Sequence, residues 1–316
     1  MHPAGVTWQH TTATAHLRSN KDSDVKIKDL IGQHDGPFYS LEYFPPKNPE
    51  MWPKFFANVG RLMALNPVFC SVTYGAGGGT QDNTFEITRR FKQDLDLEPM
   101  PHLTCVGATK DKIRGFVSQL RDIGVDNVLA LRGDAPADAG FSWDDGEFRH
   151  ASDLVEFVNA EFPEMCVGVA GYPTAHPESA SFAEDLHWTK AKIDAGSDFI
   201  VCQLLFDVRE YFHFVAQLRA MGVTSPVLPG ILPIQSLESV RRILSLCGAN
   251  IPGRFYLQLE EADAKGGAAA VKELGTKFAA DMIRRLVDGG APGVHLYTLN
   301  QAETCLRIAE MAGPLR

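Results

Sequence analysis

Eight short apolar runs recur along this chain of 316 residues, and helical patterns fill the intervals between them. Most of the runs are rich in Val, Ile, Leu, Phe and Tyr, which is typical of parallel strands covered on both faces. The predicted strands span residues 38–44, 68–74, 102–106, 127–131, 166–171, 199–206, 227–232 and 294–299. Eight alternating strand and helix units favour an α/β fold with a single (β/α)8 barrel, the TIM barrel, over an open doubly wound sheet.

The helical patterns consist of apolar residues three and four positions apart, as at Phe55 and Val59. Thr109 precedes another such pattern and is predicted to cap its first turn. The interval before the last strand is longer and holds two helical patterns, at 237–246 and 268–286.

Length and composition suit one large catalytic domain. Residues 24–316 are assigned to the barrel, and 45% of the chain is hydrophobic, enough for a large core. Residues 1–23 are polar and mixed in charge, so they predict a poorly ordered N-terminal arm rather than a signal peptide. No apolar run is long enough to predict a membrane span. The net charge of −9, without a basic run, argues against nucleic-acid binding. The six cysteines form no CxxC pair, which indicates reduced core thiols in a cytoplasmic protein.

Three of the predicted strands end in polar signatures. Glu42 lies in the first strand, Asp134 follows Arg132 after the fourth, and His176 follows the fifth. The C-terminal ends of all strands in such a barrel face one mouth, where the chemistry of these folds takes place. Three charged signatures in that position indicate an enzyme.

Glu42 has apolar neighbours on both sides in the sequence. If these also surround it in the barrel mouth, burial is expected to raise its pKa and make it a general acid. An ordinary strand-end glutamate is the alternative, as a structural ion pair is for Asp134. Asp185, Trp188 and Lys192 fall on one face of a predicted helix, which is either a site face or a solvated one.

A glycine-rich run at 75–79 follows the second predicted strand. It matches neither the GxGxxG nor the Walker spacing, so a flexible loop and close backbone approach to a flat ligand or a phosphate both stay open. His102 and His176 belong to no HxH or HExxH pattern, and no metal site is predicted.

Eight motifs, taken in order, resemble those of the methylenetetrahydrofolate reductase family. They are SLEYFPPK, SVTYGAGGG, PHLTC, LALRGD, GYPTAHPE, CQLLFD, LPGILP and HLYTLN, and they extend from about residue 39 to residue 300. Each motif alone is modest, whereas the ordered set is specific and covers essentially the whole predicted barrel.

The resemblance implies a (β/α)8 barrel that binds FAD non-covalently and reduces 5,10-methylenetetrahydrofolate to 5-methyltetrahydrofolate. It implies a ping-pong reaction, in which hydride passes from NADH or NADPH to flavin N5 and then, after the donor leaves, to the methylene carbon of the folate. It also implies a cytoplasmic flavoprotein of one-carbon metabolism and methionine biosynthesis. Homo-oligomers are common in the family, and no C-terminal regulatory domain is expected here.

By the same resemblance, Glu42 protonates the folate, Asp134 lies near the flavin and hydrogen-bonds the pterin, and Gln203 holds the pterin. Further residues match the family's positions around FAD. They are Thr73, Tyr74, Ala76, His102, Arg132, Gly133, Asp134, Tyr172, His176, Asp185 and Lys192, continued by His150 and Ala151.

The sequence departs from the family at two positions. Gln301 stands where members often have an arginine that helps to bind folate, so Gln301 is assigned to the substrate site with folate affinity open. Ile243 stands where some members place an aromatic residue against the nicotinamide. The donor therefore stays open between NADH, NADPH and a protein, and the alternative function is a flavin-carrying subunit of a larger redox complex. The motif set disfavours proline dehydrogenase, and the lack of a lysine in the predicted strands disfavours a class I aldolase.

Overall fold

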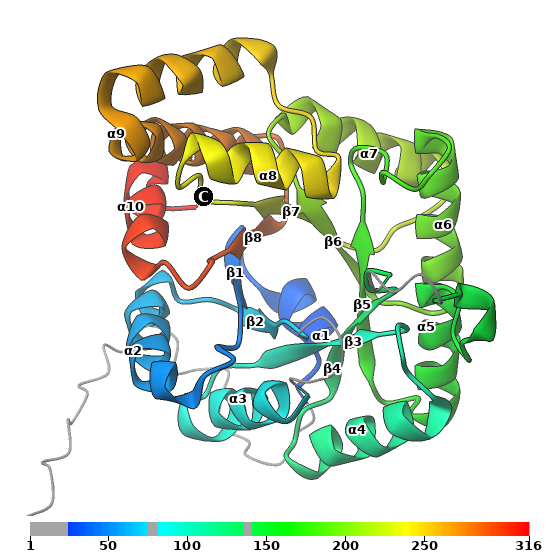
Figure 1. Ribbon diagram of the computed structural model, residues 1–316. Coiled ribbons are helices and arrows are strands. Elements are labelled where there is room, and N and C mark those ends of the chain that lie inside the picture. Colours follow the sequence, from blue (N-terminus) through cyan, green and yellow to red (C-terminus); the bar gives the residue numbers. More distant parts are fainter. Residues whose placement is uncertain (1–24, 75–80, 136–140, 316) are drawn as a thin grey trace, which may run out of the picture.

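The computed structural model describes residues 25–74, 81–135 and 141–315 and contains a closed barrel of eight parallel strands (Figure 1). Each strand pairs with the next one in the sequence, and β8 closes the barrel against β1. The strands are β1 (Phe38–Tyr43), β2 (Phe69–Val72), β3 (Pro99–Thr104), β4 (Asn127–Leu131), β5 (Cys166–Gly171), β6 (Phe199–Leu204), β7 (Val227–Ile231) and β8 (Gly293–Tyr297). This architecture confirms the predicted (β/α)8 barrel. The expected arm, residues 1–23, lies outside the described residues.

Helices form a ring around the barrel (Figure 1). They are α1 (Ile27–Gln33), α2 (Trp52–Leu62), α3 (Gln81–Asp94), α4 (Lys110–Asp122), α5 (Ala151–Glu161), α6 (Phe182–Asp194), α7 (Val208–Ala220), α8 (Leu237–Cys247), α9 (Gly253–Asp288) and α10 (Ala302–Ala312), with short 3-10 helices η1 (Pro49–Met51), η2 (Met63–Leu65) and η3 (Trp143–Asp145). Thr109 caps α4 as predicted, because its side chain accepts a hydrogen bond from the Lys112 N–H at 3.2 Å.

Side chains of β1 alternate between two layers. Tyr43 points outward and meets the rings of Phe55 and Phe91 at centroid distances of 6.0 and 5.2 Å. Glu42, one residue before Tyr43, and Ser40, three residues before it, point into the barrel. There they contact residues of β2, β3 and β8. The two-residue period of a strand therefore separates the outer apolar core from a polar interior at this strand.

Helix α1 closes the N-terminal end of the barrel. Ile27 and Ile31 of this helix pack with Phe38, Met100 and Phe199 in a buried cluster separate from the main outer core. This end of the barrel, its floor, is therefore closed by an apolar cluster, and the polar side chains that line the cavity lie at the opposite end.

A buried polar network fastens the segment before α1 to this floor. Asn127 is fully buried, and its Oδ1 accepts a hydrogen bond from the Ile27 N–H at 2.7 Å. Its Nδ2 donates to the Val25 carbonyl and to Glu98 Oε1, both at 2.8 Å. Glu98 Oε2 accepts from Lys92 at 2.6 Å. Every polar atom of the Asn127 side chain thus has a partner, which is what burial of an amide requires.

Glu98 makes the stability of the protein depend on pH. Burial raises its pKa to about 7, even though Lys92 acts in the opposite direction. A carboxyl whose pKa is raised in the folded state binds its proton more tightly there, so its contribution to stability is full below the unfolded pKa and declines as pH rises toward 7. Between about pH 5 and pH 8 this group alone should lower the free energy of unfolding by about 2–3 kcal/mol. Urea denaturation at both pH values should show that the free energy of unfolding falls less in Glu98→Gln than in the wild type. An equal fall in the two proteins would show that Glu98 ionises freely in the folded protein.

Most strand boundaries differ from the prediction by one or two residues, and the largest differences are in β3 and α9. Strand β3 begins at Pro99 rather than at His102. Pro99 and Pro101 read as strand breakers, but they lie two residues apart, so both missing N–H groups fall on one edge of the strand. Helix α9 is one long element whose first half was not predicted, and it turns at Gly267, where φ is 60° (Figure 1). Only glycine adopts that backbone conformation without strain.

Within the described part of the chain, no helix is both long enough and apolar enough to cross a membrane. All six cysteines are free thiols, five of them buried.

Candidate active site

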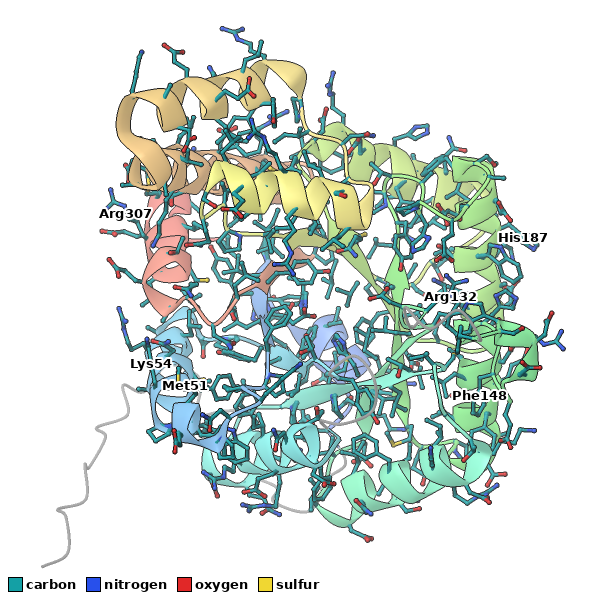
Figure 2. All side chains as sticks on the ribbon, viewed as in Figure 1. Met51, Lys54, Arg132, Phe148, His187 and Arg307 are labelled. Carbon is teal, nitrogen blue, oxygen red and sulfur yellow. The ribbon has the colours of Figure 1, made fainter. Side chains whose placement is uncertain are left out.

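A cavity of about 690 Å3 lies at the C-terminal ends of the strands. The ends of β1, β3, β4, β6 and β8 contribute to its wall together with α5, α6 and α8. Most of the residues assigned to the site from the sequence line it, namely Glu42, Tyr74, His102, Arg132, Gly133, Asp134, His150, Ala151, Tyr172, His176, Asp185, Lys192 and Gln203. Figure 2 shows Arg132 inside the ring of helices, whereas His187 and Arg307 lie on its outer side.

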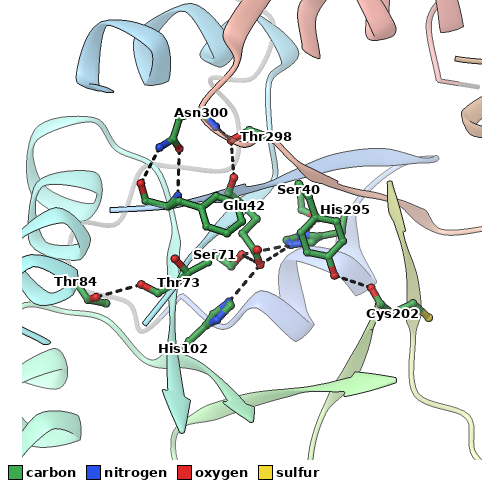
Figure 3. A network of polar contacts seen from close by, with 12 residues as sticks. Ser40, Glu42, Ser71, Thr73, Thr84, His102, Cys202, His295, Thr298 and Asn300 are labelled. Atoms are coloured by element: carbon green, nitrogen blue, oxygen red, sulfur yellow. Dashed lines mark hydrogen bonds and ion pairs between the residues drawn. The ribbon is translucent and has the colours of Figure 1, made fainter. Parts of the chain in front are cut away.

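One oxygen of Glu42 is the meeting point of three side chains from three other strands (Figure 3). Ser71 Oγ donates a hydrogen bond to Oε2 at 3.0 Å. His102 Nε2 lies 3.3 Å from the same oxygen, at ion-pair distance but without good hydrogen-bond geometry. His295 Nε2 approaches it to 3.5 Å. Glu42 itself is 5% exposed, so this carboxylate is held inside the barrel mouth rather than in solvent.

The expectation that burial raises the pKa of Glu42 is wrong. Burial does act in that direction, but the contacts with His102 and His295 outweigh it, and the pKa of Glu42 is lowered to about 2. Its neighbours in the sequence are apolar, but its neighbours in space are polar, because they come from adjacent strands. The carboxylate is therefore an anion at neutral pH, and any proton that it delivers has to come from a neighbouring group.

Sequence reasoning missed two members of this network, Ser71 and His295. Both lie in strands that were predicted correctly, and both are fully buried. The available signal was a polar residue inside an apolar strand run at an inward-facing position, which is where Glu42 also lies.

Helix α6 presents a buried polar face to the cavity. Asp185 Oδ2 accepts from the His176 N–H at 2.5 Å, and its Oδ1 accepts from Ser179 Oγ at 2.7 Å, so Asp185 anchors the loop after β5. Lys192 Nζ donates to the Ala170 carbonyl at 2.6 Å. Burial lowers the pKa of Lys192 to about 8, with Asp185 acting to raise it. The alternative of a solvated helix face is therefore excluded for these two residues.

Arg132 follows β4 and contacts residues of the loops after β4 and after the neighbouring strand β5. It forms an ion pair with Glu178, and its guanidinium lies 4.7 Å from the ring centroid of Trp143. Gly133 has a φ of 84°, and a Cβ atom there would lie 2.9 Å from Val106 Cγ1. A side chain at that position would be strained and crowded, so glycine is required where the chain turns beside the cavity.

The proposed substrate contacts lie at different depths. Asp134 is exposed at the rim, whereas Gln203 is part of β6 and its Oε1 accepts from the Leu204 N–H at 2.9 Å. The pairing of β6 with β7 shifts register between Val201 and Leu204. Such irregularities re-aim side chains next to binding sites, which accounts for the placement of Gln203 in the wall.

Stacked rings form part of the cavity wall. His150 lies parallel to Trp188, with centroids 4.3 Å apart and an interplanar angle of 17°. Tyr172 meets His176 edge to face at 4.9 Å. Trp188, singled out from the sequence only as a neighbour on the helix, thus takes part in the wall.

Two of the assigned residues that the structure describes do not line the cavity. Thr73 is half-buried, and its carbonyl accepts a hydrogen bond from Thr84 Oγ1 at 3.1 Å. Gln301 is exposed and directly precedes α10. Ala76 lies outside the described residues. The geometry therefore gives no support to a substrate contact through Gln301.

The donor set suits a flat dinucleotide better than a metal. In the described ranges, no group of three or more His, Cys, Asp or Glu side chains is arranged to hold a metal ion. Arg132 and Lys192 supply two cations for a diphosphate, and Tyr172, His150 and Trp188 supply ring faces. The cavity volume falls within the range of about 300–1,000 Å3 that is usual for cofactor and ligand sites.

The matching family model and the most similar named relatives point to one family. The family model for methylenetetrahydrofolate reductase matches residues 26–313. The 5,10-methylenetetrahydrofolate reductase of Salmonella typhimurium is 35% identical over 298 residues, which cover 94% of this chain and 97% of that protein. The protein named methylenetetrahydrofolate reductase (NADH) 1 of Arabidopsis thaliana is 37% identical over 294 residues and 90% of this chain. The chain spans about half the length of the plant relatives it matches, 49% in the Arabidopsis case.

A solved structure supports the fold independently. An uncharacterized protein from Clostridium thermocellum, described as binding two copies of 5-methyl-5,6,7,8-tetrahydrofolic acid, superposes with a TM-score of 0.65. The alignment covers 90% of this chain and 97% of that chain at 14% identity. At this identity the likeness bears on the barrel architecture alone.

Proposed function

Since the chain belongs to the methylenetetrahydrofolate reductase family, we propose that it reduces 5,10-methylenetetrahydrofolate to 5-methyltetrahydrofolate, with FAD as cofactor and NADH or NADPH as the donor. The relatives whose length the chain matches carry that name, and the plant relatives are named as NADH enzymes. The residues around the cavity supply the chemistry that this reaction needs.

The observation that carries the proposal is the arrangement around Glu42. Among the described residues, its side-chain contacts converge on Oε2, which leaves Oε1 available to a ligand in the cavity. Reduction of a methylene bridge to a methyl group breaks a carbon–nitrogen bond, and the departing nitrogen must gain a proton. His102, which lines the cavity and contacts the same carboxylate, supplies that proton, and the ionised Glu42 passes it to the nitrogen through Oε1.

The other residues bind and orient. FAD, when bound, carries hydride between the donor and the folate. Arg132, now paired with Glu178, and Lys192 would supply two cations to hold the diphosphate of that cofactor. Gln203 and Asp134 hydrogen-bond the pterin from two different strand ends, which fixes its position relative to Glu42.

The donor side of the cavity is apolar. Ile243 of α8 lines it together with Leu232 and Leu299. Ile243 itself offers no ring for a nicotinamide to stack on, and this keeps a protein electron donor as the second candidate. Oxidation of NADH or NADPH by the isolated protein, with menadione as acceptor, separates the two, because a subunit fed by a protein would oxidise neither.

The purified protein is expected to be yellow and to release FAD, not FMN, when it is denatured. The paired cations Arg132 and Lys192 suit a diphosphate bridge, which FMN lacks. Chromatography of the released flavin against both standards checks this. Release of FMN alone, or reconstitution of the apoprotein only with FMN, would contradict the assignment of the cavity to FAD.

A further inference from the structure

His295 of β8 lies beneath the cavity and is sealed from it. The side chain is fully buried and is not among the residues that line the cavity in the described part of the chain. Phe69 stacks on its ring at a centroid distance of 6.2 Å and an angle of 22°, and Tyr297 meets it edge to face at 5.3 Å. No ligand in the cavity can touch this histidine directly, yet its Nε2 lies 3.5 Å from Glu42 Oε2.

Both ring nitrogens of His295 have serine partners (Figure 3). Nδ1 lies 2.9 Å from Ser40 Oγ, and Nε2 lies 3.3 Å from Ser71 Oγ. Ser71 uses its one hydrogen to donate to Glu42 Oε2, so its oxygen is left to accept from the His295 Nε2–H. The serine and the histidine therefore hold Oε2 together from the closed side of the barrel.

The network accommodates either protonation state of His295 without moving a heavy atom. In the neutral ring, Ser40 Oγ donates to Nδ1. In the charged ring, Nδ1–H donates to Ser40 Oγ, whose own hydrogen then passes to the Val294 carbonyl at 3.4 Å. Ser40 therefore holds the His295 ring in the same place through either direction of their hydrogen bond.

The titratable groups that face His295 are Glu42 from β1, His102 from β3 across the carboxylate, and Tyr297 from its own strand. The hydroxyl of Tyr297 donates to the Cys202 carbonyl at 2.8 Å, and burial raises the pKa of this phenol, so it stays neutral. Glu42 thus has two histidine partners: His102 lines the cavity, whereas His295 is buried beneath it.

We propose that His295 is a positioning residue for Glu42: it holds Oε2 from the sealed side, so that Oε1 faces the ligand and proton exchange runs through His102. The kinetic consequences rest on the proposed function, but the ionisation of Glu42 does not. Removal of His295 should leave the buried Glu42 carboxylate with fewer polar partners to offset the cost of burying its charge. A carboxyl in such a site is expected to hold its proton at neutral pH.

Two variants separate charge from shape. His295→Phe keeps a ring to pack against Phe69 and removes both nitrogens, whereas His295→Gln keeps an N–H donor within the same interior. Ser71→Ala is the control for loss of a neutral donor. The Glu42 carboxyl is followed by carbon NMR in protein labelled with 13C-glutamate, and its resonance is identified by its loss in Glu42→Gln. No substrate or cofactor turnover is needed for this measurement.

The wild-type resonance should stay at the ionised position from about pH 5 to pH 9, because the pKa of Glu42 is held low by its contacts. In His295→Phe it should titrate within that window, with smaller displacements in His295→Gln and Ser71→Ala. If His295→Phe does not fold, the test rests on whether the Glu42 resonance titrates in His295→Gln. A carboxyl that remains fully ionised in every folded His295 variant overturns the proposal.

Kinetics give the second readout. His295→Phe should lower the folate-dependent rate at least about tenfold with little change in KM, and leave menadione-linked donor oxidation unchanged. Equal losses in both activities would mean that His295 only supports the fold, and would overturn the positioning role. A wild-type protein in which Glu42 stays ionised but which shows no folate reduction would contradict the proposed function and leave the ionisation network standing.

Discussion

Replacement of Glu42 by glutamine is expected to lower the rate of folate reduction about 10²–10⁴-fold and to leave reduction of the bound flavin by the donor largely intact. The amide keeps the shape of the side chain and its contact with Ser71, but it cannot hold or release a proton at Oε1. Ser71, His102 and His295 hold the other oxygen, Oε2, in place. Among the described contacts, no other side-chain oxygen takes the place of Oε1. Stopped-flow absorbance at the flavin band follows the two half-reactions separately.

Glu161→Gln is the matched control for this variant. Glu161 ends α5 on the surface, where it pairs with Arg114 at 2.9 Å, far from the described cavity wall. It should retain both half-reactions. Equal loss of both half-reactions in Glu42→Gln would show that Glu42 supports the structure rather than the chemistry.

Asn127→Leu is expected to lower the free energy of unfolding by about 3 kcal/mol or more. Leucine has a similar volume, but it leaves the Ile27 N–H, the Val25 carbonyl and one oxygen of Glu98 without their partner in the barrel floor. Each buried group left unsatisfied costs about 1–3 kcal/mol. Urea denaturation monitored by circular dichroism measures the effect.

Lys28→Ala provides the comparison at the same end of the barrel. Lys28 pairs with Asp198 at 2.8 Å, but its side chain is 41% exposed, so this loss should cost less than about 1 kcal/mol. Similar small losses in both variants would mean that water satisfies the groups around Asn127 and that the floor is not sealed.

Much of the barrel could be predicted from the sequence, because buried parallel strands are short, apolar and regularly interrupted by helices. The errors arose where local chemistry contradicts the final structure. Pro99 and Pro101 disfavour a strand in isolation, but tertiary pairing with β2 tolerates them. The helix that includes Gly267 contains a turn that no periodicity indicates.

The site was predictable only in part. Strand-end logic pointed to Glu42 and Asp134, but it gave the wrong direction for the pKa of Glu42, since the two histidines near it are remote in sequence. The cofactor residues came from the family resemblance alone. Thr73 directly precedes the cavity-lining Tyr74, and Gln301 lies two residues after the cavity-lining Leu299, yet neither lines the cavity itself. Strand pairing and helix capping decide whether a side chain at a strand end points into the cavity, and neither can be read from a single sequence.

Product analysis tests the central claim most directly. The isolated protein, reconstituted with FAD, is incubated anaerobically with 5,10-methylenetetrahydrofolate and either NADH or NADPH, and the folates are identified by mass spectrometry. Formation of 5-methyltetrahydrofolate in proportion to donor oxidised, and its loss in Glu42→Gln, is the predicted result. Donor oxidation with menadione but no methyl product, in a protein that holds FAD, would contradict the assignment of the cavity to folate reduction.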